Sequence, residues 1–424
     1  MSVRWVRFAR VSMQRPGQLI AVAASASDNS PTSLQGLGRT YAGIVRRGYK
    51  VSGDQADEVK RYLHALRLWK RYGGHQGALA KLDDVEELSA VELQDIWLAN
   101  PQLPSATGAV TDDVIDELPQ LAANIGLVRQ HNFTRNDRGR AIAALYSDDL
   151  LKIAEGDVSV NLFQMITRGS AGLHDRPGGA CYLLYSLIEA DGDFLTAAWY
   201  TQLQEGDQTF TRASFGSLLP TACRRLADRI SKSRSMEDRH LVSRLDATAR
   251  HIDEKTPSNQ KTWGGGRPRD QVATLRLEPY VDFGLVTKES RTDYRYSLDE
   301  VQRAFFQDLT AAPDLQVYLD TNLVAAYLTG IGRVPIRLKG DEIWERIKDA
   351  YQMLRSGLGY APAKEVVLLA IAILLNEGGT SCFEVADGIA SLREEQQRHP
   401  DQIRYGVSRT GEPTHVRMGR KPRA

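Results

Sequence analysis

A pattern of helix end, short hairpin and new helix occurs twice in this chain and constrains the fold more than any other feature. The first copy contains Ile125-Gly126-Leu127-Val128 and the second contains Phe283-Gly284-Leu285-Val286, each at the end of an apolar helical segment. Glycine at this place supplies the left-handed residue that terminates a helix. The Leu-Val pair then begins a strand, and the polar residues after it turn a hairpin.

The residues after each hairpin predict the start of another helix. An aromatic residue ends the return strand in both copies, and a hydroxyl residue follows it. Thr134 is predicted to cap the next helix with Asp137 as its acidic partner, and Ser297 is predicted to do so with Glu300. Each copy therefore predicts a helix, two short strands and a closing helix.

This order of elements resembles the end of a winged-helix domain, in which a recognition helix precedes a two-stranded wing. The resemblance covers roughly residues 54–146 and 270–310, and its double occurrence carries it, because no single residue is diagnostic. It implies modules that dock DNA or protein. Acidic residues at Asp112-Asp113 would repel phosphate, so we interpret the first copy as a protein-docking module.

A third candidate module lies at the C-terminus, where three predicted helices precede a hairpin. The helices are expected over Asp341–Ser356, from Pro362 through Leu375, and from a capping box of Ser381 and Glu384 to just before Pro400. The hairpin strands are expected at 403–407 and 414–418. Alternation places apolar side chains on its inner face and Arg404, His415 and Arg417 on its outer face.

Helical spacing dominates the remainder of the chain. The fold class is therefore predicted to be mainly α with small β-hairpins, in a multi-domain chain of repeated winged-helix-like modules. Further helices are expected at Asp54–Tyr72, after the Ser89–Glu92 capping box, after Thr111 with a break or kink at Pro119, and near 178–190, 217–231 and 236–253. The Gly- and Pro-rich segment Lys255–Asp270 predicts a mobile linker.

These patterns divide the chain into four predicted parts. They are 1–150, an N-terminal helical region with the first module; 151–255, a central helical region; 256–310, the basic linker with the second hairpin module; and 311–424, the C-terminal module with a basic tail.

Composition predicts a protein of the cytoplasm. The 54 Lys and Arg residues nearly balance the 53 Asp and Glu residues, so any nucleic-acid signal must come from local clusters of charge. The three cysteines are far apart and form no CxxC motif, which favours reduced thiols. No apolar run reaches the roughly 18–20 residues that a membrane helix needs, so no membrane partner is expected.

Clusters of arginine give the candidate DNA contacts, because arginine neutralises phosphate and enters narrow minor grooves. The candidate residues are Arg135, Arg138, Arg267, Arg269, Arg404, Arg409, His415, Arg417, Arg420, Lys421 and Arg423. The final 23 residues contain a single acid, Glu412, so this end of the chain is strongly basic.

Two of the basic segments resemble the AT-hook, a minor-groove motif with the core Arg-Gly-Arg-Pro. They are Gly266-Arg267-Pro268-Arg269 and Gly419-Arg420-Lys421-Pro422-Arg423. Both depart from the motif, because the residue before the glycine is Gly265 or Met418 and Lys421 interrupts the second. An ordinary basic loop is the alternative interpretation of both.

Motifs for enzymatic chemistry are absent from the sequence. It has no GxxxxGK loop, no GxGxxG after a strand, no HExxH, no GxSxG and no closely spaced His/Cys set. No cofactor, metal ligand or catalytic residue is therefore assigned. A metal-dependent nuclease needs only a few acids, and the possible fragments are Asp54 to Lys60 and a predicted turn containing Asp191 and Asp193, with Glu205.

We expect a non-enzymatic DNA-binding subunit or regulator, within a bacterial DNA-processing, plasmid-maintenance or anti-phage defence assembly. Its expected partners are double-stranded DNA and other protein subunits such as an ATPase, a helicase or a nuclease. Two alternatives stay open: a scaffold whose winged helices dock partner proteins, and a metal-dependent nuclease with winged-helix recognition modules. The oligomeric state is not predicted.

Overall fold

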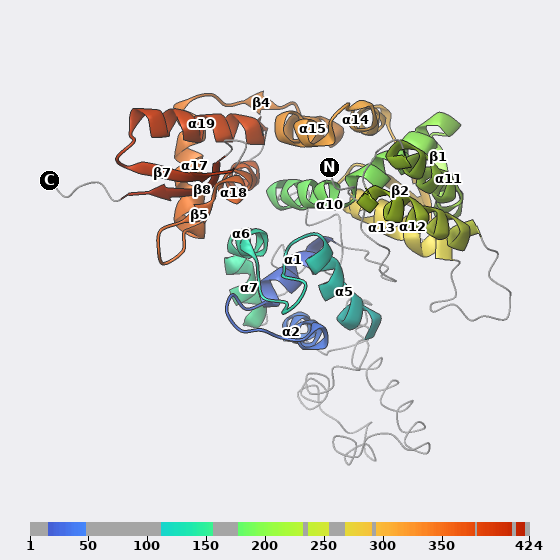
Figure 1. Cartoon of the computed structure of the whole chain (residues 1–424), viewed down its shortest axis with the longest axis horizontal. Helices are drawn as coiled ribbons and strands as arrows, with labels where there is room; N and C mark the ends of the chain where they lie inside the picture. The colour runs from blue at the N-terminus through green and yellow to red at the C-terminus, as the bar shows by residue number, and fades with distance from the viewer. Residues whose placement is uncertain are drawn as a thin grey trace, which may run out of the picture.

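The computed structural model describes residues 16–47, 112–155, 177–231, 236–253, 268–290, 294–377, 380–408 and 413–419. Across these residues the protein is mainly helical with a few small sheets, as the sequence predicts. The chain forms an elongated body, with the β7–β8 hairpin at one end and the α11, α12 and β1–β3 elements at the other (Figure 1). No described helix is long and apolar enough to cross a membrane.

The first region is a helical group closed by a very short hairpin. Its helices are α1 (Pro16–Ser25), α2 (Leu34–Arg47), α5 (Asp112–Asn124), α6 (Asp137–Leu145) and α7 (Ser147–Ala154). The hairpin is a single antiparallel bridge between Val128 and Arg135. The segment after α1 lies beside its return arm, because the Thr32 amide donates to the Asn132 carbonyl and the Arg135 amide to the Ser27 carbonyl.

The second region combines five described helices with a three-stranded antiparallel sheet. In chain order the elements are α10 (Pro177–Glu205), β1 (Thr209–Thr211), α11 (Arg212–Ser231), α12 (Met236–Asp253), α13 (Pro268–Asp282), β2 (Thr287–Ser290), β3 (Arg295–Ser297) and α14 (Glu300–Ala311). The strand order is β1-β3-β2. The sheet thus joins residues on both sides of the predicted boundary at 255/256. The core of the second region includes Trp199 of α10, whose ring stacks on Phe306 of α14 at 3.8 Å between centroids.

The third region begins with two short helices and ends with the C-terminal hairpin. Its elements are α15 (Leu315–Thr321), α16 (Leu323–Gly330), β4 (Ile336–Arg337), α17 (Asp341–Leu354), β5 (Ala361–Pro362), α18 (Ala363–Asn376), β6 (Ser381–Cys382), α19 (Val385–Arg398), β7 (Ile403–Val407) and β8 (Pro413–Met418). One sheet has the antiparallel order β5-β8-β7, and β4 pairs with β6 in parallel.

The helix ends of the doubled pattern are confirmed. Gly126 and Gly284 have φ values of +77° and +78°. In both copies the glycine amide bonds back three residues and the following leucine amide bonds back five, to Ala122 in one copy and Tyr280 in the other. These two bonds form a Schellman motif, which satisfies the last carbonyls of the helix.

The predicted caps after the hairpins are wrong. Asn136 caps α6 by accepting from the Gly139 amide, and Asp299 caps α14 in a capping box with Gln302. Thr134 is excluded because α6 begins only at Asp137, and its hydroxyl donates to the Asn132 side chain at 2.8 Å. Ser297 is excluded because it is the last residue of β3. The cap therefore lies two residues later in each copy.

Several other expectations need correction. Ser381 lies in β6, so the capping box of α19 is formed by Glu384 with Asp387. Pro119 lies inside α5 and does not end it. The predicted turn at 190–193 is the middle of α10, and the predicted linker ends earlier because α13 begins at Pro268. The predicted helices at 54–72 and after Ser89 lie outside the described residues, as do Thr111 and most of the linker.

Candidate nucleic-acid interface

The C-terminal hairpin places two arginines directly opposite each other. Arg404 of β7 pairs with Arg417 of β8, and the next pair on the same face is Gly406 with His415. All these residues are exposed, whereas Ile403 and Val416 on the other face are buried. The alternation predicted from the sequence is therefore confirmed near the base of the hairpin. Towards its tip Val407 is exposed, because the strand has left the core.

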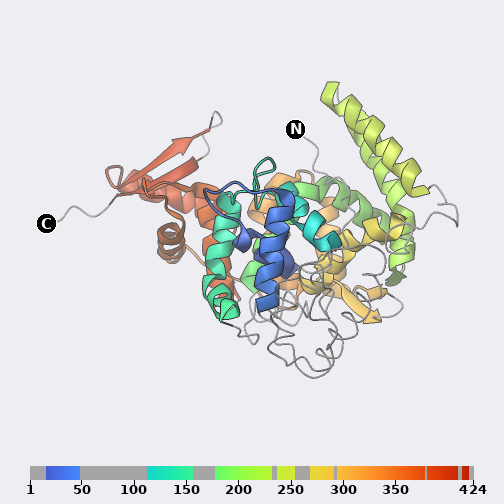
Figure 2. The ribbon, with the colours of Figure 1, turned by 90° about the horizontal axis from the view of Figure 1, so that it is seen from below.

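The base of the hairpin is fixed to the rest of the third region by Tyr351. The buried Tyr351 hydroxyl donates to the Gly359 carbonyl at 2.6 Å and accepts from the Met418 amide at 3.0 Å. Strand β5 adds a second attachment, since Ala361 pairs with Val416. The hairpin thus projects from the body on a rigid base (Figure 2).

The charges on this face are not balanced within the part of the chain that the structure describes. There, no carboxylate forms an ion pair with Arg404 or Arg417. The Arg417 guanidinium instead lies 5.4 Å from the ring centroid of the exposed Tyr360. Like charges directly opposite each other destabilise a strand pair. An anion bound between the two arginines would remove this repulsion.

The structure describes few of the other predicted contacts in the basic segments. Arg409, Arg420, Lys421, Arg423 and Arg267 lie outside the described residues. Arg269 lies in the first turn of α13, and only its backbone is described. Both segments that resemble AT-hooks therefore stay predictions.

Arg135 is used inside the first region. Its guanidinium donates to the Ala24 and Ala26 carbonyls at the end of α1, at 3.0 Å each, and lies 3.6 Å from Asp28. Burial, only partly offset by Asp28, lowers the pKa of Arg135. These contacts tie the return arm of the first hairpin to α1, so we leave Arg135 out of the interface.

Arg138 lies in a buried cluster of charges between three helices, which we call the Arg138 cluster. Its side chain on α6 is 13% exposed and contacts Glu189 of α10 at 2.6 Å and Glu365 of α18 at 3.2 Å. Burial alone would lower the pKa of Arg138, but Glu365 and Glu189 outweigh it, and the pKa is raised. Arg138 is therefore a structural cation and is also left out of the interface.

Two further residues complete the Arg138 cluster. Lys364 of α18 contacts the second oxygen of Glu189 at 2.6 Å, and the Tyr182 hydroxyl of α10 donates to Glu365. Burial first, and then Glu365, raise the pKa of Tyr182 well above its ordinary value. The cluster thus holds α6, α10 and α18 together, and with them all three regions. Its members lie far apart in the chain, so no local pattern could have predicted it.

The start of α10 also packs very closely on α18. A Cβ atom at Gly178 would lie 1.9 Å from the Ala372 carbonyl oxygen. The Gly178 amide donates to the Asn376 side chain at 2.9 Å. Glycine is needed here because two helix backbones approach each other. This packing reinforces the joint made by the Arg138 cluster.

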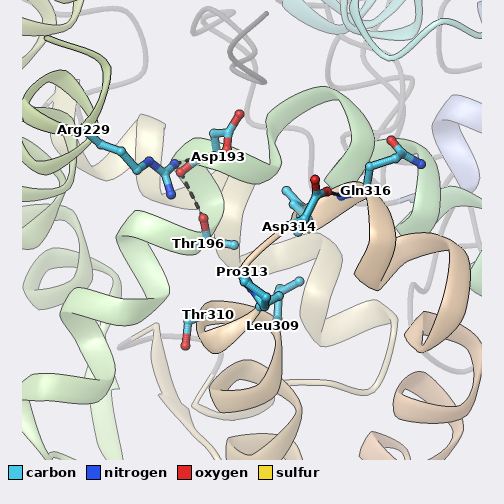
Figure 3. A pocket seen from close by; sticks show the side chains of 10 residues that line it. Asp193, Thr196, Arg229, Leu309, Thr310, Pro313, Asp314 and Gln316 are labelled. Carbon is cyan, nitrogen blue, oxygen red and sulfur yellow. Dashed lines mark hydrogen bonds and ion pairs between the residues drawn. The ribbon is translucent and has the colours of Figure 1, made fainter. Parts of the chain in front are cut away.

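A pocket of about 350 Å³ lies between α10, α11, α14 and α15 (Figure 3). Its polar residues already have partners within the fold. Arg229 forms an ion pair with Asp193 at 3.1 Å, and Asp314 caps α15 by accepting from the Gln316 and Val317 amides. The pocket therefore offers no cluster of free groups for chemistry.

The acids of α10 that were a possible nuclease fragment do not come together at one site. Asp191 forms a buried ion pair with Arg276 of α13 at 2.8 Å, and Asp193 pairs with Arg229. Glu205 is exposed at the end of the helix. Among the described residues no three His, Cys, Asp or Glu side chains are placed to hold a metal ion. The fragment from Asp54 to Lys60 lies outside those residues.

Helix α19, which precedes the C-terminal hairpin, presents few donors for DNA bases. The exposed residues of its first two turns are Ala386 and Ala390, and Glu394 and Gln397 follow. Arg398 at its end is paired with Glu395 at 2.5 Å. Reading of base edges depends on Arg, Lys, Asn and Gln side chains. The hairpin, rather than this helix, is the cationic part of the third region.

Comparisons with protein-family models, with curated proteins and with solved structures found no match to this chain.

Proposed function

We propose that this protein binds duplex DNA through a C-terminal winged-helix module whose wing is the β7–β8 hairpin. The observation that carries the proposal is the exposed Arg404–Arg417 pair, which has no carboxylate partner among the described residues. The order α17, β5, α18, α19, β7, β8 with sheet order β5-β8-β7 supports it. Three helices followed by a two-stranded wing is the order that the winged-helix resemblance implies, and β5 adds a third strand to the wing.

The same order supports winged-helix modules in the other two regions. In the second region it is α10, β1, α11, α13 and the β2–β3 hairpin, with α12 as an additional helix and the sheet order β1-β3-β2. In the first it is α1, the segment 27–32, α2, α5 and the Val128–Arg135 bridge. In both copies a side-chain amide also donates a hydrogen bond to the carbonyl of the helix-ending glycine. Asn136 donates to Gly126, and Gln302 donates to Gly284.

The proposed binding mode is contact with the phosphate backbone. Arginines on a wing neutralise phosphates, which gives affinity without sequence information. The exposed alanines of α19 offer no hydrogen bonds to bases. We therefore expect this chain to bind duplexes of different sequence with similar affinity.

The test is a fluorescence-anisotropy titration of mixed-sequence duplex with the full chain at low salt. The variant Arg404→Glu/Arg417→Glu should weaken binding by about tenfold or more, because two charged hydrogen bonds to phosphate are removed. The matched control is Lys339→Glu/Lys348→Glu, which changes the net charge equally in the same region outside the hairpin; Lys339 is exposed, and Lys348 is a half-buried partner of Glu345. This control should lower affinity much less.

Two results would contradict the proposal. One is no binding by the unaltered protein even at low salt, where phosphate contacts are strongest. The other is equal weakening by the hairpin variant and the control, which would show that only net charge matters. Circular dichroism of each variant establishes that it is folded.

A protein-docking role for the C-terminal module is the second candidate, and the surface of α19 favours it. The first two turns of this helix expose Ala386 and Ala390 and contain no cation, and the exposed Glu394 follows. Nearby, Val334 and Ile336 around β4 are exposed by 79% and 58%. Retention of a partner protein by the hairpin variant, together with unchanged DNA affinity, would favour this role over the first.

A further inference from the structure

The outward face of the C-terminal sheet carries an aromatic ring beside its arginines. One residue before the pairing of β5 with β8 begins, Tyr360 lies next to Arg417, which in turn lies opposite Arg404. The neighbouring residues Ala361 and Val416 point to the buried face. Tyr360, Arg417 and Arg404 therefore form a row across the sheet, which we call the Tyr360 row.

The loop that carries Tyr360 is fixed, yet the side chain stays open to solvent. The Ser356 amide donates to the Tyr360 carbonyl and the Gly359 amide to the Ser356 carbonyl, each at 2.8 Å, so the loop is closed on itself. The Tyr351 hydroxyl ties this loop to β8 by bonding to Gly359 and Met418. Nevertheless 43% of Tyr360 is exposed. A ring held in this way can be stacked upon without first being ordered.

The surroundings of Tyr360 are cationic and apolar. The sequence contains no acid from 350 to 364. In this stretch Arg355 is exposed and forms no ion pair within the described chain, and Leu358 in the turn of the loop is 79% exposed. Asp401, the exposed acid before β7, is not paired with either arginine of the row among the described residues. A ligand of this surface should therefore combine negative charge with a flat or apolar surface.

An unpaired base beside its phosphates has both properties. Inside a duplex the faces of each base are covered by its stacked neighbours, so a fixed ring can stack only on a base beyond the paired region. Proteins bind single strands with aromatic rings that stack on bases and cations that follow the backbone. We propose that the Tyr360 row recognises duplex DNA with a single-stranded extension. An unpaired base stacks on Tyr360, while Arg404 and Arg417 contact the flanking phosphates.

This inference rests on the proposed function, so the experiment measures both. Fluorescence anisotropy compares binding of the full chain to a blunt duplex and to the same duplex with a short 3′ or 5′ extension. The unaltered protein should bind an extended duplex about fivefold or more tightly, as expected when one base stacks on an aromatic side chain. An extension that keeps its phosphates but lacks its bases should give no such preference, which separates stacking from added charge.

Variants of Tyr360 assign the preference to this ring. Tyr360→Ala should bind extended and blunt duplexes equally, whereas Tyr360→Phe, which keeps the ring, should retain the preference. The matched control is Tyr200→Ala, because Tyr200 of α10 is 44% exposed and has Arg225 over its ring at 4.9 Å. This control should leave the preference unchanged. The readout is the ratio of the two affinities, since loss of the ring can also displace Arg417 and weaken both.

The outcomes are distinguishable. If the unaltered protein binds blunt and extended duplexes equally, the stacking site is refuted and the proposed function stands. If Tyr360→Ala keeps the full preference, or if the extension without bases is bound as tightly as the complete one, no base stacks on this ring and the inference is likewise refuted. If the unaltered protein binds neither duplex, the proposed function itself fails.

Discussion

Arg138 and the pair Arg404–Arg417 are the same residue type in opposite surroundings. Arg138 is 13% exposed and contacts two carboxylates from two other helices. Arg404 and Arg417 are exposed on a projecting hairpin and face each other. The first arrangement uses the positive charge to hold helices together, and the second leaves it for an external anion. Arginine in a basic cluster of the sequence is therefore not by itself a sign of DNA binding.

The largest change in stability is expected when the Arg138 cluster is broken. Arg138→Met leaves Glu365 without its cation and Glu189 with Lys364 alone, and removing one partner of a buried ion pair costs about 3–5 kcal/mol of unfolding free energy. Urea denaturation measures it. The matched control is Arg140→Met, two residues further along α6, whose ion pair with Asp137 is far more exposed and contributes about 0–1 kcal/mol. Equal destabilisation by the two variants would contradict the structural role of Arg138.

The buried arrangement also predicts how stability depends on pH. Burial opposes ionisation of Glu189, but Arg138 and Lys364 outweigh it and hold its pKa below the ordinary value. The unfolded chain therefore binds this proton more readily, and stability falls as pH drops below about 4.3, the usual glutamate pKa. Glu189→Gln should flatten that part of the profile of unfolding free energy against pH. An unchanged profile would show that Glu189 does not contribute to it.

The smallest change in unfolding free energy is expected from the Arg404–Arg417 pair. Removing one of these arginines should stabilise the protein, whereas removing Arg138 destabilises it. Arg404→Thr removes the repulsion with Arg417 and should raise the unfolding free energy by about 0.2–1 kcal/mol. The same change should weaken duplex binding. Arg404→Lys keeps the charge and should change neither quantity strongly. A lower stability of Arg404→Thr would mean that the pair is not repulsive in the free protein.

The sequence predicted the features that depend on neighbouring residues. The glycine ends at Gly126 and Gly284 and the alternation that exposes Arg404 and Arg417 follow from local backbone and strand periodicity. The caps lie two residues later than predicted, because several residues near each helix start can act as caps. Only the fold shows that the Thr134 hydroxyl is already bound to Asn132.

What the sequence could not predict depends on contacts between distant segments. Arg138 meets Glu189 and Glu365, which are 51 and 227 residues away. Glycine is likewise required at position 178, because the Ala372 carbonyl of α18 leaves no room for a side chain. The pairing of β1 with β3 was not predicted because helices α11, α12 and α13 lie between these strands in the chain.

The salt dependence of duplex affinity tests the central claim most directly. Removing one arginine that neutralises a phosphate reduces the slope of log affinity against log salt concentration by about 1. Arg404→Glu/Arg417→Glu should therefore have a slope smaller by about 2 than the unaltered protein, while Arg138→Met, where folded, keeps the full slope. An unchanged slope in the hairpin variant would contradict the claim that the hairpin contacts phosphate.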